Sequence, residues 1–162
     1  MTLFHHQLLQ TAIPESDGLE SHVGNTPLLP LRRIGLSLNL PPSVKVLAKA
    51  EWFNPGGSVK DRPAFNIIRT AIANGDLHPG KRLLDSTSGN MGIAYATFGA
   101  ALGFPVTLTM PENASPERVS ILHALGAELV LTDPLEGSDG AILVARQMTA
   151  ENPEMWRYRS SR

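Results

Sequence analysis

The chain has 162 residues, the size of one ordinary domain or of one half of a larger protein, and its 42% hydrophobic and 18% charged residues are close to globular averages, which argues against a disordered, collagenous or coiled-coil chain. Its net charge of -1 offers no general electrostatic footprint for nucleic acid or an anionic membrane, so small ligands fit better. Because the chain has no cysteine, a disulfide framework, a thiolate zinc site and a cysteine nucleophile are excluded.

The N-terminal segment lacks the basic and then apolar stretches of a secretory signal. No uninterrupted apolar run is long enough for a membrane-spanning helix. We therefore expect a cytoplasmic protein without a membrane or nucleic-acid partner. No metal site is predicted either, because metal-ligand spacing is absent among the five histidines, His5, His6, His22, His78 and His123.

Residues 1–22 are expected to form an N-terminal extension, and the chain that follows is expected to be extended up to about residue 50. Short strands are predicted at residues 28–31 and 44–48. Gly35 and the pair Pro41-Pro42 separate the two strands as breakers. From residue 50 onward, helix and strand patterns alternate.

The first half of the alternating region predicts two helices and two strands. Apolar residues recur at helical spacing after Ser58 and stop before Asn74-Gly75. A short buried strand is predicted at residues 82–84. Small apolar residues from 89 to 103 predict a helix that packs closely on a sheet, and residues 106–110 predict the next strand.

The second half continues this alternation. Ser115 is predicted to cap a helix with Pro116 at its first position and an end at Gly126. A strand is predicted at residues 129–131, and Ser138 is predicted to cap a last helix. The buried face of that helix is expected to consist of Ala141, Val144, Ala145 and Met148. Since parallel strands need crossover connections, the alternation predicts a parallel sheet with helices on its faces and a ligand at the carboxyl ends of its strands.

The segment at residues 54–62 is the first that could carry chemistry. Ser58 and Asp61 fit a capping box that opens the helix. The positive charge of Lys60 in the first turn is unfavourable for the helix dipole. Residues that are locally unfavourable are often functional, so Lys60 is a candidate functional residue. A solvated lysine without a function is the alternative. The spacing around Lys60 does not match a phosphate-binding P-loop. Trp52 and Phe53 are expected to pack beneath this loop.

A second segment, Thr87-Ser88-Gly89-Asn90-Met91, lies between a predicted strand and a predicted helix. Backbone N–H groups at the start of a helix point outward and favour an anion. A simple turn with Ser88 or Asn90 as the cap is the alternative. A dinucleotide-binding glycine motif does not occur in the chain.

Five segments of the chain, taken together, resemble the pyridoxal-phosphate-dependent cysteine synthases in order and spacing. The resemblance extends from about Val23 to about Asn152. It implies an α/β fold, a three-layer parallel sheet with helices on both faces, as in the tryptophan synthase β-like fold type II of pyridoxal-phosphate enzymes. Cystathionine β-synthases look almost the same in these segments, so they remain the alternative family. The segments are Gly24-Asn25-Thr26-Pro27-Leu28, residues 54–62, Thr87-Ser88-Gly89-Asn90, Met110-Pro111-Glu112-Asn113 and Leu125-Gly126-Ala127-Glu128-Leu129.

The resemblance also implies the cofactor and the roles of the site residues. Lys60 would hold pyridoxal 5'-phosphate as a Schiff base and then remove the α-proton of the substrate. Asn90 would donate a hydrogen bond to the phenolic oxygen of the cofactor. The substrate α-carboxylate would be bound by Thr87, Ser88, Gly89, Asn90 and Met91.

By the same resemblance, the reaction would be a β-replacement on an activated serine such as O-acetylserine. The partners would be a small amino-acid substrate and a sulfur donor, and the product would be cysteine. The full-length enzymes of the family would be homodimers. A non-catalytic remnant or interaction module of the same fold is the alternative from a different class.

Two departures from the family pattern limit this expectation. Met91 stands where the family usually has threonine, which predicts an altered substrate affinity. The glycine-rich loop for the cofactor phosphate, the hydroxyl residue that faces the pyridine nitrogen and a glutamine near the substrate carboxylate have no counterpart before Arg162. We therefore expect a truncated N-terminal portion that is weakly active or inactive alone.

The resemblance divides the chain further. Residues 23–50 would be strands of the sheet of an absent larger domain, so they would lack most of their partners here. Residues 51–152 would form the small α/β domain that carries the lysine and the Ser-Gly-Asn loop. Residues 153–162 would be a tail, in which Arg157, Arg159 and Arg162 are expected to be solvated.

Overall fold

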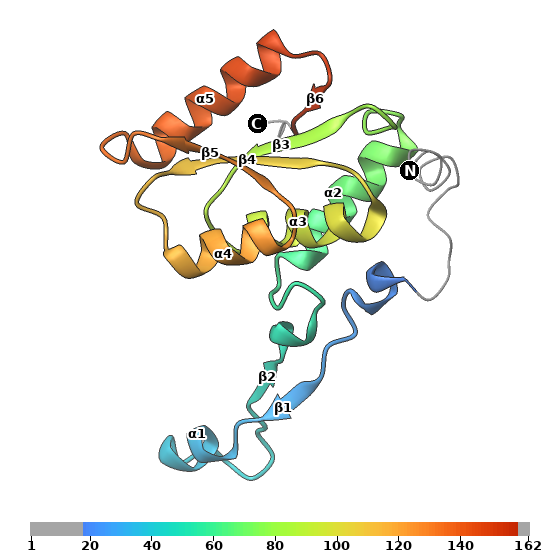
Figure 1. Ribbon diagram of the computed structural model, residues 1–162. Coiled ribbons are helices and arrows are strands. Elements are labelled where there is room, and N and C mark those ends of the chain that lie inside the picture. Colours follow the sequence, from blue (N-terminus) through green and yellow to red (C-terminus); the bar gives the residue numbers. More distant parts are fainter. Residues whose placement is uncertain (1–17, 159–162) are drawn as a thin grey trace.

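The structure is a computed structural model, described here for residues 18–158. It consists of an α/β body and an arm, which we define as residues 28–49. Figure 1 shows the arm extending away from the body, to which the chain returns through the segment that carries Lys60. A short 3-10 helix, η1 (Leu19–His22), precedes the arm and contacts the body at α3 (Asn90–Leu102).

The body is built on a parallel four-stranded sheet. Its strands are β3 (Arg82–Ser86), β4 (Val106–Pro111), β5 (Glu128–Thr132) and β6 (Met155–Trp156), in the order β5-β4-β3-β6. Every pair is parallel, with Leu84 opposite Thr107 and Leu108 opposite Leu129. Strand β4 is buried from its first residue through Met110, as expected for an inner strand covered on both faces.

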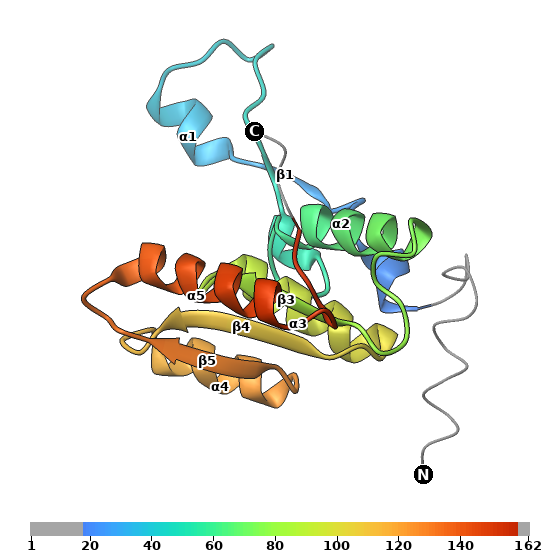
Figure 2. The same cartoon turned by 90° about the horizontal axis from the view of Figure 1, so that it is seen from above.

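Helices cover both faces of this sheet, so the predicted three-layer fold is confirmed. Helix α5 (Gly137–Glu151) lies on one face. Helices α3 and α4 (Pro116–Ala124) lie on the other, and α2 (Asp61–Ala73) packs against α3 (Figures 1 and 2).

The core lies between α2, α3 and the sheet. Phe98 of α3 is completely buried, and its ring centroid lies 5.4 Å from that of Phe65 on α2. Gly99 allows α3 to approach β4 closely, because a Cβ atom at this position would overlap Val106. This packing explains why the predicted helix at residues 89–103 is so rich in small residues.

Some element boundaries differ from those predicted. Helix α5 begins at Gly137 with Glu136 as its N-cap, so Ser138 lies inside the first turn and is not the cap. Ser115 is the N-cap of α4 as predicted, but its hydroxyl group donates to the Glu117 carboxylate and caps no backbone N–H. The predicted buried face of α5 is partly confirmed, since Ala141 and Ala145 are buried and the other two residues are half-buried.

One α-helix and one strand were not predicted, and neither were the short 3-10 helices η1 and η2 (Glu51–Phe53). Helix α1 (Arg32–Ser37) occupies a segment expected to be extended. Strand β6 occupies part of the expected tail and pairs with β3, with Arg82 opposite Met155 and Leu83 opposite Trp156. Residues 155–156 therefore belong to the sheet.

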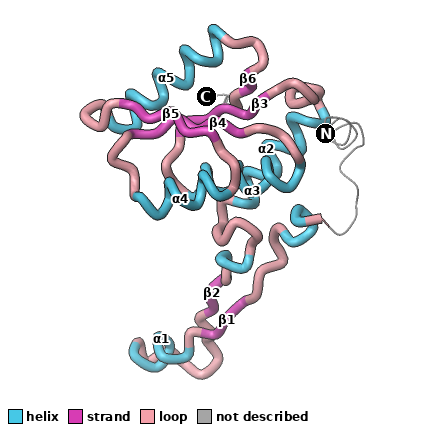
Figure 3. The backbone as a smooth tube through the Cα atoms, viewed as in Figure 1, coloured by secondary structure: helices cyan, strands magenta, loops and turns pink. Residues whose placement is uncertain are grey.

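The arm contains an antiparallel pair of short strands, β1 (Leu28–Pro30) and β2 (Leu47–Lys49), visible in Figure 3 as a narrow ribbon below the body. The second strand thus begins three residues later than predicted and ends one residue later. Large apolar side chains of the arm are exposed, and Leu36 of α1 is 77% exposed. An isolated two-stranded ribbon is only marginally stable in water. The exposed apolar side chains of the arm could therefore pack against a further element.

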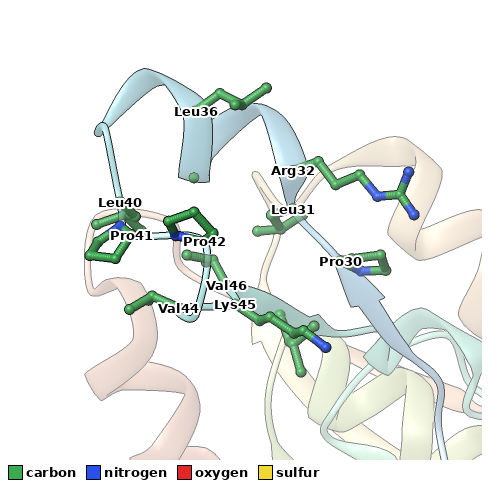
Figure 4. Close-up of a pocket in the computed structure, with 12 residues that line it drawn as sticks. Pro30, Leu31, Arg32, Leu36, Leu40, Pro41, Pro42, Val44, Lys45 and Val46 are labelled. Atoms are coloured by element: carbon green, nitrogen blue, oxygen red, sulfur yellow. The ribbon is translucent and has the colours of Figure 1, made fainter.

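A groove of about 690 Å³ lies within the arm. Figure 4 shows Leu36 of α1 on one side of the groove and Val44 and Val46 on the other. The residues predicted for the active site do not line it. Among residues 18–158, each helix is too short or too polar to cross a membrane.

Candidate active site

The fold brings the two predicted site segments to the same edge of the sheet. Helix α2 leads into the start of β3, and α3 begins after the carboxyl end of β3. Both helices therefore run opposite to the strands, and Figure 2 shows them side by side with the same direction. Lys60, the N-cap of α2, and Asn90, the first residue of α3, consequently face the carboxyl edge, where parallel sheets bind ligands.

The lysine segment is a compact turn before α2. Lys60 is exposed, whereas Asn54 and Ser58 are buried. The Lys60 N–H donates to Ser58 Oγ over 3.2 Å. Gly57 has φ +79°, a left-handed conformation that glycine adopts without steric cost. The turn thus presents the lysine on the surface of a well-packed loop.

The predicted capping box between Ser58 and Asp61 is wrong. The Asp61 carboxylate turns back and accepts the Gly56 N–H through Oδ2. Asp61 is completely buried, and its Oδ1 has no hydrogen-bond partner among residues 18–158. The pKa of Asp61 is raised, mainly because the carboxyl group is buried. The hydrogen bond from the Gly56 N–H lowers the pKa in part, and the negative charge of Glu51 raises it further. The carboxyl group therefore fixes the loop from inside.

The second segment forms an open turn at the start of α3. The Gly89 N–H donates to Thr87 Oγ1 over 3.2 Å, and the Gly89 carbonyl accepts the N–H groups of the first helical turn. The backbone N–H groups of Asn90 and Met91 have no acceptor among the described residues. These free donors at a helix N-terminus suit an anion such as a carboxylate.

Two side chains complete the surroundings of this turn. Met91 is half-buried and packs against the core, so its backbone N–H is the donor that it offers to a ligand. The Arg118 guanidinium of α4 donates to the Ser88 carbonyl over 3.3 Å. Arg118 thus places a positive charge beside the turn. This contact was not predicted from the sequence, because the two residues are far apart in the chain and no short-range pattern links them.

Other expectations about the surroundings are corrected. Trp52 and Phe53 do not pack beneath the lysine loop: they are 59% and 60% exposed, and their ring centroids lie 6.0 Å apart. Arg157 is not solvated, because it lies 3.6 Å from Asp85 of β3 and its side chain is only 19% exposed. Arg159 and Arg162 lie outside the described residues, as do His5 and His6. No cluster of three potential metal ligands occurs within residues 18–158.

Comparison with known proteins decides the family. A family model described as a pyridoxal-phosphate dependent enzyme matches residues 19–161. The chain belongs to this family. Pyridoxal phosphate is the cofactor of the family, and the fold of the chain is its fold type II.

The relatives of this pyridoxal-phosphate family member include cysteine synthases. The chain is 53% identical over 136 residues to a cysteine synthase of Aquifex aeolicus, with 84% of this chain and 41% of that protein covered. It is 42% identical over 135 residues to a cystathionine beta-synthase of Saccharomyces cerevisiae, with 81% and 26% covered. The crystal structure of a cysteine synthase from Entamoeba histolytica superposes with a TM-score of 0.84 at 39% identity, with 91% and 44% covered. The chain spans less than half the length of these relatives.

The donor set of the site fits the family's cofactor and an amino acid. Pyridoxal phosphate is an aldehyde that reacts with amines, and Lys60 presents an exposed primary amine at the carboxyl edge. Asn90 is exposed and carries an amide that can donate to an oxygen. The free N–H groups of the α3 turn match the carboxylate of an amino acid.

Proposed function

We propose that this chain supplies the lysine and the amino-acid-binding segment of an enzyme that makes cysteine by β-replacement on an activated serine. The observation that carries the proposal is the position of Lys60 and the α3 turn at one edge of the sheet, in a chain 53% identical to a cysteine synthase. O-acetylserine is the proposed substrate and sulfide the proposed sulfur donor.

Lys60 would hold the cofactor through Nζ, and the same amine would accept the α-proton of the substrate. When bound, pyridoxal phosphate supplies an electron sink for the bonds at the substrate α-carbon. The Asn90 amide would donate a hydrogen bond to the cofactor's phenolic oxygen. These roles need a primary amine and an amide donor at one edge of the sheet, and the exposed residues at the N-termini of α2 and α3 support this.

The α3 turn orients the substrate. The α-carboxylate of the substrate would be held by Thr87, Ser88 and Gly89 together with the free backbone N–H groups of Asn90 and Met91. A carboxylate at a helix N-terminus gains from both hydrogen bonds and the helix dipole. Methionine has no hydroxyl group, and the Met91 side chain packs on the core, so the turn has one hydroxyl fewer than a threonine there would provide. We therefore propose a changed substrate affinity.

We further propose that residues 23–50 complete the sheet of a second domain and that residues 51–152 form the small domain. The exposed apolar side chains of β1 and β2 support this division, because such side chains need a covering partner. A homodimer is the proposed assembly of the complete enzyme. The described chain alone is then expected to show little synthase activity.

A chimera tests the proposed function. Residues 19–158 of this chain would be joined to the part of the Aquifex aeolicus cysteine synthase that they do not match. We expect the chimera to form cysteine from O-acetylserine and sulfide, and we expect Lys60→Ala to lower its rate by about 100-fold or more because the base is lost. A folded chimera that binds pyridoxal phosphate but forms no cysteine would contradict the proposal.

Cystathionine formation is the second candidate, favoured by the 42% identity to a yeast cystathionine beta-synthase. The same chimera separates the two when homocysteine replaces sulfide. A higher kcat/KM with homocysteine would assign the second function. An interaction module without catalysis would instead leave the Lys60→Ala chimera indistinguishable from its parent.

A further inference from the structure

A partly buried polar cluster lies next to the lysine loop. We call it the Glu51 cluster; its members are Thr26, Glu51, Asn54 and Arg62. Glu51 Oε2 accepts from Arg62 Nε over 2.8 Å and from Asn54 Nδ2 over 2.9 Å. Glu51 Oε1 accepts from Arg62 Nη2 over 2.9 Å and from Thr26 Oγ1 over 2.8 Å. One carboxylate thus receives four hydrogen bonds.

The cluster joins both ends of the loop that carries Lys60. Asn54 lies at the start of that loop and Arg62 at its end, in the first turn of α2. Asn54 also donates to the Glu51 carbonyl over 2.7 Å and accepts the Gly24 N–H over 2.8 Å. Thr26 and Asn54 are 5% and 3% exposed. Any shift of either loop end would therefore break hydrogen bonds of the partly buried cluster, two of whose members, Thr26 and Asn54, are almost fully buried and costly to leave unpaired.

An ordinary surface ion pair would not constrain the loop in this way. The pair of Arg82 and Glu128 is the matched comparison in this chain. It also joins an arginine to a glutamate, but it connects β3 and β5 across β4 and holds no loop. Isolated pairs of this kind contribute little, about 0–1 kcal/mol. The bidentate geometry of Arg62 and the two additional donors distinguish the Glu51 cluster.

We propose that Glu51 is a positioning residue for Lys60: through Asn54 and Arg62 it fixes both ends of the loop so that the lysine amine stays at the carboxyl edge of the sheet. The inference rests on the proposed function of Lys60. It adds a residue that touches neither cofactor nor substrate and acts through the loop.

The charge state of the cluster gives this role a pH dependence. The hydrogen bond from Arg62, followed by that from Thr26, lowers the pKa of Glu51 to about 2 from an ordinary value of 4.5. The charged groups that face it are Arg62 and the buried Asp61, and Lys49 bonds to the Thr26 carbonyl. A lowered pKa means that the stabilising contribution is complete above pH 4.5 and is lost as the pH falls toward about 2. The loop should stay ordered at neutral pH.

The test compares Glu51→Gln with Glu128→Gln in the complete chain. Each protein would be treated with pyridoxal phosphate and borohydride, and peptide mapping would give the ratio of label on Lys60 to label on Lys45, an exposed lysine of the arm. We expect Glu51→Gln to lower this ratio by about 10- to 100-fold, since small misplacements of reacting groups have effects of this order. Glu128→Gln should leave the ratio unchanged. An unchanged ratio in Glu51→Gln would overturn the inference.

A second readout keeps the inference separate from the proposed function. Hydrogen exchange of the peptide that spans residues 54–62 should be faster in Glu51→Gln, while exchange in β3 and β4 stays as in the parent. If the parent itself shows no preference for labelling Lys60, the proposed function fails. Hydrogen exchange still tests the positioning in that case, and equal exchange in both proteins would refute it.

Should Glu51→Gln fail to fold, Arg62→Lys offers a milder change. Lysine keeps the positive charge but cannot form the two parallel hydrogen bonds of the guanidinium. We expect a smaller decrease of the labelling ratio with unchanged circular dichroism. Equal labelling in Arg62→Lys and in the parent would speak against the cluster as a positioning device.

Discussion

Replacing Lys60 with alanine should remove the specific covalent labelling of the chain by pyridoxal phosphate and borohydride. Lys60 is the exposed N-cap of α2, and the proposed function makes its amine the group that reacts with the cofactor aldehyde. Label on the peptide that contains residue 60 should fall to background, while label on the other lysines, Lys45, Lys49 and Lys81, should not change. Peptide mapping by mass spectrometry measures each site separately.

The same substitution should hardly affect stability. A positive charge at a helix N-terminus is slightly unfavourable, and an exposed side chain contributes little packing, so the free energy of unfolding should change by less than about 0.5 kcal/mol. Lys45→Ala is the matched control and should leave labelling of Lys60 intact. Labelling concentrated on Lys45 or Lys81 in the parent would contradict the assignment of Lys60.

Replacing Phe98 with alanine should lower the free energy of unfolding by about 3–5 kcal/mol, because the side chain is completely buried and its loss leaves a cavity. Phe98 contacts Phe65 across the interface of α2 and α3, with ring centroids 5.4 Å apart. These are the helices whose N-termini carry Lys60 and Asn90. Urea unfolding followed by circular dichroism gives the change.

Leu135→Ala is the control for this experiment, since Leu135 is 93% exposed and its truncation should cost less than about 0.5 kcal/mol. Equal effects of the two substitutions would show that α2 and α3 do not pack as described. A Phe98→Ala protein that stays folded should also label Lys60 less, because the two helix N-termini would lose their fixed relation.

The body of the fold could be predicted from the sequence because its patterns are local. Alternating apolar periodicity and the breakers Asn74-Gly75 and Gly126 predicted the order of elements in a parallel sheet. Helix α1 and strand β6 were not predicted, since α1 contains Gly35, a predicted breaker, and β6 has only two residues. Two residues provide no measurable periodicity, and β6 is defined by its pairing with β3.

The polar contacts around the site could not be predicted, because they join residues far apart in the chain. Glu51 and Arg62 bracket the lysine loop, and Thr26 comes from before the arm. Asp61 fits a capping box by spacing, yet its carboxylate accepts the Gly56 N–H of the turn. Local spacing cannot distinguish these two partners. Trp52 and Phe53 were predicted to pack beneath the lysine loop, whereas both residues are exposed.

The most direct test of the central claim is a titration of the isotope-labelled chain with pyridoxal phosphate, followed by amide NMR. The claim is that the loop before α2 and the turn before α3 form one ligand site. We predict that the amide shifts concentrate in residues 56–61 and 88–92, and that Lys60→Ala abolishes them in both segments together. Shifts confined to the groove of the arm, or shifts in the α3 turn that persist without Lys60, would contradict the account.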